Sequence, residues 1–130
     1  MTLTDNIRGL FNQCNPQTYT DLMQLSSLSP DQAAKIRPVW VELSTDRKHA
    51  LLSRLIELGE ENVEFDFGQI FLTSLEDENG MIRKKGVQGL WESEDRTVIT
   101  PLIELLLNDP LGDVRVVAAL SLGKFAASAQ

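Results

Sequence analysis

The chain has 130 residues, of which 42% are hydrophobic and 24% charged, and its formal net charge is −7. These values are typical of one soluble globular domain with a core of its own. The acidic balance argues against nucleic acid, whose binding needs a basic stripe, and against anionic membrane surfaces. We therefore expect an unidentified protein partner, no nucleic acid and no membrane.

The cysteine content and the N-terminus indicate the compartment. A single cysteine, Cys14, excludes an intrachain disulfide and suits a reducing environment. No apolar run approaches the roughly 20 residues that span a bilayer. Asp5 and Arg8 interrupt the N-terminal segment, which differs from a secretory signal. We predict a cytoplasmic protein.

The first 28 residues are expected to form one or two short helices that cap the end of the core. The first of them shows apolar residues at helical spacing, namely Leu3, Ile7, Leu10, Phe11 and Cys14. The second amphipathic segment runs from Tyr19 to Leu28.

Two longer helices follow. Ser29 and Gln32 form the pattern of a capping box, with Pro30 at the first helical position. This helix is predicted to run to Leu43, with a bend or a displaced hydrogen bond at Pro38. The next begins at residues 44–45 and is predicted to end at Gly59 as a C-cap.

The remainder is predicted to contain four helices, over residues 65–75, 82–91, 98–107 and 114–127, separated by short polar turns. No segment alternates as a strand would, so the predicted fold class is all-α.

The last four helices form a repeat. Shifting the sequence by 32 residues aligns residues 73–93 with residues 105–125 without gaps, with five identities in 21 positions. The identical pairs are Leu75/Leu107, Asp77/Asp109, Gly80/Gly112, Arg83/Arg115 and Leu90/Leu122. A repeated unit of two helices and a turn is the signature of stacked repeats.

The run from Asp109 through Val114, Arg115 and Ala118 to Gly123 resembles the second helix of HEAT repeats, especially the short bacterial type of phycobilin lyases. Residues 77–90 are a degenerate copy. The resemblance implies an α-solenoid of about three stacked antiparallel helix pairs. Residues 1–28 would then be N-terminal capping helices, and residues 29–130 a HEAT-like domain with repeats at about 29–60, 64–93 and 95–128.

The turn aspartates and the helix arginines are expected to tie neighbouring repeats together, as the resemblance implies for Asp77, Arg83, Asp109 and Arg115. An arginine in the first turn of a helix is unfavourably placed in the helix dipole, so an acid should lie nearby. We expect Arg83 and Arg115 each to pair with an aspartate of its own or the adjacent turn.

Candidate chemistry is sparse. Cys14 and His49 could form a nucleophile and base only across different predicted helices, and a packed thiol with a surface histidine is the alternative. Residues 80–86 contain two glycines but do not follow a strand as a phosphate loop would. We expect no catalytic site, no metal and no cofactor, so the chain is predicted not to be an enzyme.

An acidic stretch is the least ordinary feature of the composition. Between Leu55 and Ile82 there are eight acids and no lysine or arginine. Residues 76–80 lack the oxygen spacing of a calcium loop, so a solvated turn is the simpler interpretation. A surface for a basic partner is the alternative. Its candidate residues are Glu60, Glu61, Glu64, Asp66 and, as an aromatic anchor, Trp91.

The leading prediction is a non-catalytic HEAT-like scaffold or adaptor that binds a protein partner. The alternatives are an accessory component of a bilin lyase or similar modifying enzyme, and the N-terminal segment of a longer HEAT solenoid. The last helix is apolar on several sides, which also predicts self-association through Val114–Ala127.

Overall fold

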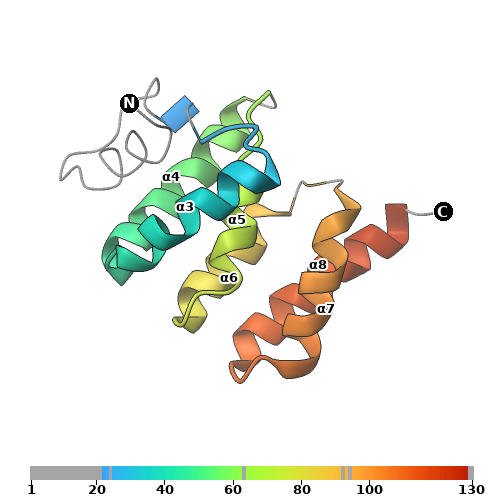
Figure 1. Ribbon diagram of the computed structural model, residues 1–130. Coiled ribbons are helices and arrows are strands. Elements are labelled where there is room, and N and C mark those ends of the chain that lie inside the picture. Colours follow the sequence, from blue (N-terminus) through green and yellow to red (C-terminus); the bar gives the residue numbers. More distant parts are fainter. Residues whose placement is uncertain (1–21, 24, 63, 92, 94, 129–130) are drawn as a thin grey trace.

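A computed structural model describes residues 22–23, 25–62, 64–91, 93 and 95–128 (Figure 1). The described residues are helical and contain no strand, which confirms the all-α class. The helix predicted over residues 3–14 lies outside them. The elements are α3 (Pro30–Glu42), α4 (Thr45–Glu61), α5 (Gly68–Ser74), α6 (Gly80–Gly89), the 3-10 helix η1 (Arg96–Val98), α7 (Ile99–Asn108) and α8 (Gly112–Ser128).

Side-chain caps fix where three of the helices begin. The predicted capping box is confirmed: Ser29 Oγ accepts from the Gln32 N–H at 3.1 Å, and Gln32 Oε1 accepts from the Ser29 N–H at 2.9 Å. Ser44 Oγ accepts from the Arg47 N–H and starts α4. Asn79 Oδ1 accepts from two N–H groups of α6, so this helix begins at Gly80, two residues before the predicted start.

Two predicted helix ends are wrong. Gly59 lies inside α4, which continues to Glu61 and is capped by Asn62, because no left-handed residue follows Gly59 to stop it. The segment predicted as a helix to Leu28 instead forms a turn at residues 25–27. Ser27 has φ 57° there, and its N–H donates to the Asp66 carbonyl.

The start of α5 also differs from the prediction. The helix begins at Gly68 rather than Phe65, because the Asp66 carboxylate accepts from the Gly68 N–H and ends the preceding extended segment. Phe65 and Phe67 lie before the helix, with ring centroids 5.3 Å apart. Pro38 does not interrupt α3, which continues to Glu42.

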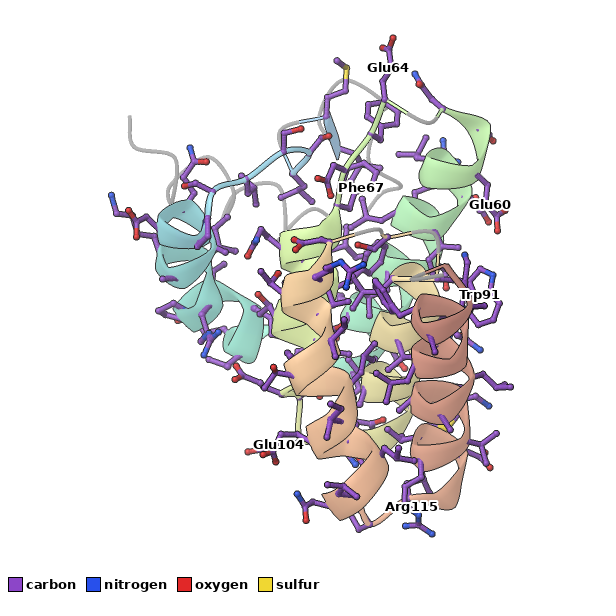
Figure 2. The ribbon with its side chains drawn as sticks, turned by 90° about the vertical axis from the view of Figure 1, so that its right-hand side faces the viewer. Glu60, Glu64, Phe67, Trp91, Glu104 and Arg115 are labelled. Atoms are coloured by element: carbon purple, nitrogen blue, oxygen red, sulfur yellow. The ribbon has the colours of Figure 1, made fainter. Side chains whose placement is uncertain are left out.

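The helices lie in two layers. In Figure 2, α3, α5 and α7 occupy the left and α4, α6 and α8 the right. Within the right-hand layer α4 packs on α6 and α6 on α8, while α5 packs on α6 and α7 on α8 across the layers. The short turns 75–79 and 109–111 make each of the last two pairs antiparallel. Their buried apolar side chains form one continuous core.

Small residues set the distance between paired helices. A Cβ at Gly89 would lie 2.3 Å from the Phe71 ring, and one at Gly86 would lie 1.9 Å from Ser74 Oγ. Neither position of α6 has room for a side chain against α5. Ala118, at the position in α8 that corresponds to Gly86, is fully buried.

Candidate functional site

Charged residues recur at the same place in successive helix pairs. Lys48, Arg83 and Arg115 are each the fourth residue of their helix, because α4 begins at Thr45, α6 at Gly80 and α8 at Gly112. Asp77 and Asp109 each stand three residues before the next helix. We refer to Lys48, Asp77, Arg83, Asp109 and Arg115 as the charged ladder.

The first contact of the ladder joins α4 to the turn before α6. Lys48 Nζ lies 2.6 Å from Asp77 Oδ2, and both side chains are almost completely buried. The Trp40 Nε1–H donates to the same oxygen at 3.1 Å, and Lys48 Nζ lies 5.5 Å from the Trp40 ring centroid. The Asn79 N–H donates to Asp77 Oδ1. The carboxylate is therefore satisfied on both oxygens, which a buried charge requires.

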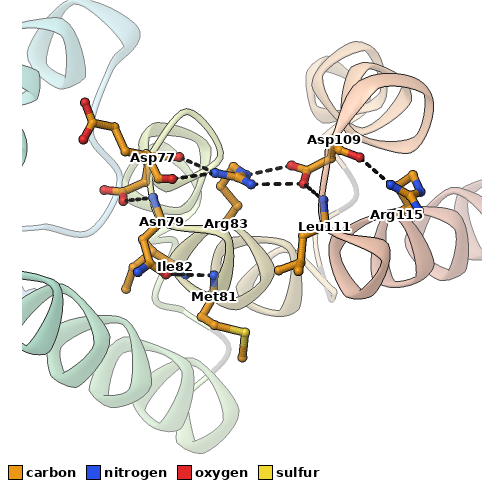
Figure 3. A network of polar contacts seen from close by, with 9 residues as sticks. Asp77, Asn79, Met81, Ile82, Arg83, Asp109, Leu111 and Arg115 are labelled. Carbon is orange, nitrogen blue, oxygen red and sulfur yellow. Dashed lines mark hydrogen bonds and ion pairs between the residues drawn. The ribbon is translucent and has the colours of Figure 1, made fainter.

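The second contact is bidentate and joins α6 to the turn before α8 (Figure 3). Arg83 Nε and Nη2 donate to the two oxygens of Asp109 at 2.6 and 3.0 Å. Arg83 Nη1 donates to the main-chain carbonyls of Asp77 and Glu78 in its own turn. One guanidinium thus holds its own turn and the next one, and such charge-assisted pairs are the strong ones.

Arg115 makes only the first half of this arrangement. Its Nη1 donates to the Asp109 carbonyl at 2.6 Å, as Arg83 does to Asp77 (Figure 3). Within the described residues, Nε and Nη2 of Arg115 meet no carboxylate, and the side chain is exposed. Within the described residues, Arg83 therefore contacts its own turn and the carboxylate of the next turn, whereas Arg115 contacts only its own turn.

Two opposing effects act on the pKa of the Asp109 carboxyl. Burial alone raises the pKa of this carboxyl. The hydrogen bonds from Arg83 and Leu111 and the charges of Arg83 and Arg115 outweigh burial, and the net pKa lies below its ordinary value of 3.8. Asp109 is accordingly an anion at neutral pH.

Lys48 was not among the predicted ladder residues. It precedes Arg83 by 35 residues, whereas Arg83 precedes Arg115 by 32, so a gapless shift misses it. The longer spacing accompanies the longer α4 and the extended segment before α5. The fourth helical position after the Ser44 cap is the signal that could have identified it.

The predicted acidic surface is exposed but has partly structural roles. Glu60, Glu61 and Glu64 are all exposed, and Figure 2 shows Glu60 and Glu64 toward the end opposite Arg115. Asp66 is exposed as well, but its carboxylate accepts from the Gly68 N–H at the start of α5. Phe67 beside it is buried in the core.

Trp91 differs from Trp40 in its surroundings. Trp40 is buried, whereas Trp91 is 44% exposed and does not pack in the core. Lys124 Nζ lies 4.9 Å from the centroid of the Trp91 ring and donates to the Trp91 carbonyl. One face of the indole is thereby covered by a cation from α8.

A shallow open hollow of about 620 Å³ lies beside the first contact of the ladder. It is lined by α3, the start of α4 and the turn before α6, and includes Trp40, Lys48 and Asp77. The Arg37–Glu76 ion pair at 2.7 Å stands among its exposed lining residues. Because Lys48 and Asp77 neutralise each other, the hollow presents no free buried charge.

The remaining candidates for chemistry are not brought together. His49 is exposed on α4, and Cys14 lies outside the described residues. Across the part of the chain that the structure describes, no group of three or more His, Cys, Asp and Glu is arranged to hold a metal ion. In that same part, no helix has both the length and the apolarity needed to cross a membrane.

Comparison of the chain with models of protein families, with curated proteins and with solved structures found no match. The charged ladder and the surfaces around it are therefore interpreted from their own geometry.

Proposed function

We propose that the chain is a non-catalytic HEAT-like scaffold that binds a protein partner. The observation that carries this proposal is the repeated geometry of the ladder. Arg83 and Arg115 each donate to the carbonyl of the aspartate six residues earlier. Asp77 accepts from Lys48 of α4 and Asp109 accepts from Arg83 of α6, so each aspartate binds a cation of the preceding helix pair. Stacked helix pairs of this kind build extended surfaces that repeat proteins use for binding.

The packing supports the same proposal. α4 packs on α6, and α6 packs on α8. Each pair contributes to a core that continues into the next, as expected for repeats that cannot bury their apolar faces alone. We propose that these pairs form a HEAT-like solenoid with repeats at about 29–60, 64–93 and 95–128.

The test is reciprocal affinity capture from the source cells with the tagged full chain. We expect a protein that is recovered again when it carries the tag itself, and that binds the purified chain directly with a measurable dissociation constant. Bilin attachment that depends on the chain in co-expression, with no direct protein complex, would contradict the scaffold and support the modifying-enzyme alternative.

A further inference from the structure

One side of the last helix pair is exposed, although the corresponding side of the preceding helix pair is covered. We define the outer face as Ile103, Leu107, Arg115, Val116, Ala119 and Leu120. Their counterparts 32 residues earlier, on α5, α6 and the residue that caps α5, are Phe71, Leu75, Arg83, Lys84, Val87 and Gln88. Figure 2 views the molecule from the end at which α7 and α8 lie in front.

The two sets differ sharply in exposure. Leu75 is 5% exposed, whereas Leu107 is 71% exposed. Phe71 is 4% exposed and its counterpart Ile103 is 42% exposed. Val87 is buried on α6, and Ala119 is exposed on α8. Apolar residues that are covered in the inner pair are thus uncovered in the last pair.

Two polar positions of the inner helix are apolar in the last one. Lys84 on α6 reaches Asp113 of α8 at 3.7 Å, and Gln88 is exposed. Their counterparts, Val116 and Leu120, are 59% and 58% exposed. A helix face in contact with water would be expected to be polar at these positions. The change in the opposite direction favours a partner.

Nε and Nη2 of Arg115, which meet no carboxylate within the described residues, indicate one chemical group of that partner. At the inner junction, Asp109 fills Nε and Nη2 of Arg83, and Leu111 packs on Gly80 so closely that a Cβ there would lie 2.6 Å from Leu111 Cδ2. At the outer junction, a Cβ at Gly112 would meet only Arg115 Nη2, at 3.5 Å. The place of the carboxylate and the place of the leucine are both open.

We propose that the outer face binds, in trans, a helix pair of a partner protein whose turn contains an aspartate followed two residues later by a leucine. The aspartate accepts from Nε and Nη2 of Arg115, the leucine packs over Gly112, and an apolar helix covers Val116 and Ala119. This inference rests on the proposed scaffold function and names the surface and the partner class. The proposed interface would repeat the α6–α8 interface on the outer face.

The Asp109 of a second copy does not supply this carboxylate. Its Asp109 carboxylate is 2% exposed and already bound by Arg83. Glu60 and Glu64 lie toward the end of the molecule opposite Arg115 (Figure 2).

The probe is a fluorescent synthetic peptide of residues 95–128, which contains one helix pair and the turn Asp109-Pro110-Leu111. It is titrated with the full chain and followed by anisotropy. We expect binding that weakens about tenfold or more in the Arg115→Ala chain, and equally with an Asp109→Asn peptide. Because the two changes remove one contact, combining them should weaken binding no further.

Three comparisons make the result decisive. Arg54→Ala removes an arginine of α4 that pairs with Glu57, and this chain should bind the peptide like the unchanged chain. Ala119→Arg places a bulky charge on the outer face and should abolish binding while the far-ultraviolet circular dichroism stays the same. No binding by the unchanged chain, or equal binding by the Arg115→Ala chain, overturns the inference.

Sedimentation velocity separates the remaining outcomes. A dimer of the chain that Leu120→Lys dissociates would mean that a second copy covers the outer face, which also overturns the inference. A partner recovered in the reciprocal capture that still binds the Arg115→Ala and Ala119→Arg chains would leave the scaffold function standing and refute this surface. Peptide binding without any recoverable partner would refute the scaffold function instead.

Discussion

At the scale of single residues, the side chain that matters most is Asp109. It accepts from the Arg83 guanidinium and the Leu111 N–H, and its own carbonyl accepts from Arg115. Its side chain is 2% exposed and that of Arg83 is 13% exposed, so solvent screens the pair weakly. Exposed pairs such as Arg54–Glu57 contribute far less, since water competes for both charges.

Replacing Asp109 by Asn should lower the free energy of unfolding by about 2–3 kcal/mol at neutral pH, because a buried guanidinium loses its counter-charge. Urea denaturation measures this difference. Glu57→Gln is the matched control and should change stability by less than about 0.5 kcal/mol. An Asp109→Asn chain as stable as the unchanged one would show that the pair is replaceable.

The pH dependence follows from the pKa of Asp109, which is lowered in the folded chain. A carboxyl of this kind stabilises the fold above its unfolded pKa, and the contribution is lost as the pH falls through the folded value. The stability gap between the unchanged chain and Asp109→Asn should therefore narrow as the pH drops below about 3.8. Urea titrations at several acidic pH values test this, and a gap that widened there would contradict the assignment.

At the scale of the helix, the close approach of α5 and α6 depends on glycine. Gly89→Ala should destabilise the fold by about 1–3 kcal/mol, because its Cβ would overlap the Phe71 ring. Gly59→Ala in α4 is the matched control, since a Cβ there has nothing within 4 Å. It should stabilise the helix by up to about 1 kcal/mol. Thermal unfolding distinguishes the two, and equal shifts would contradict the packing.

Helix identity could be predicted from sequence better than helix ends. The apolar spacing of α4, α6, α7 and α8 and the Ser29 cap identify elements that the structure confirms. The ends depend on single hydrogen bonds. The Asp66 carboxylate accepts from the Gly68 N–H, and α5 begins at Gly68 instead of Phe65. No pattern in the sequence shows that Gly59 keeps a helical conformation.

The candidate site was predictable only where the repeat spacing is constant. The 32-residue shift relates Arg83 to Arg115 and Asp77 to Asp109, but it misses Lys48. The sequence also could not predict which oxygens each arginine contacts, because this depends on how the helices stack. Trp91, which was predicted as an aromatic anchor, is exposed, and Lys124 lies over its ring.

At the scale of the whole molecule, the helix pairs α5–α6 and α7–α8 pack on each other through α6 and α8. The last pair contacts the rest chiefly through α8 on α6, and the Arg83–Asp109 contact lies in that junction. In such an arrangement each unit depends on its neighbour, so weakening one junction should release the unit beyond it and leave the others protected.

Hydrogen exchange measured by mass spectrometry on the unchanged chain and on Asp109→Asn tests this claim most directly. The account predicts faster exchange in α7 and α8, by about tenfold or more, with α4 and the Trp40–Lys48–Asp77 contact unchanged. Equal acceleration in α4 and α8 would contradict it, because the described helices would then unfold as one unit and the ladder would not join separable pairs.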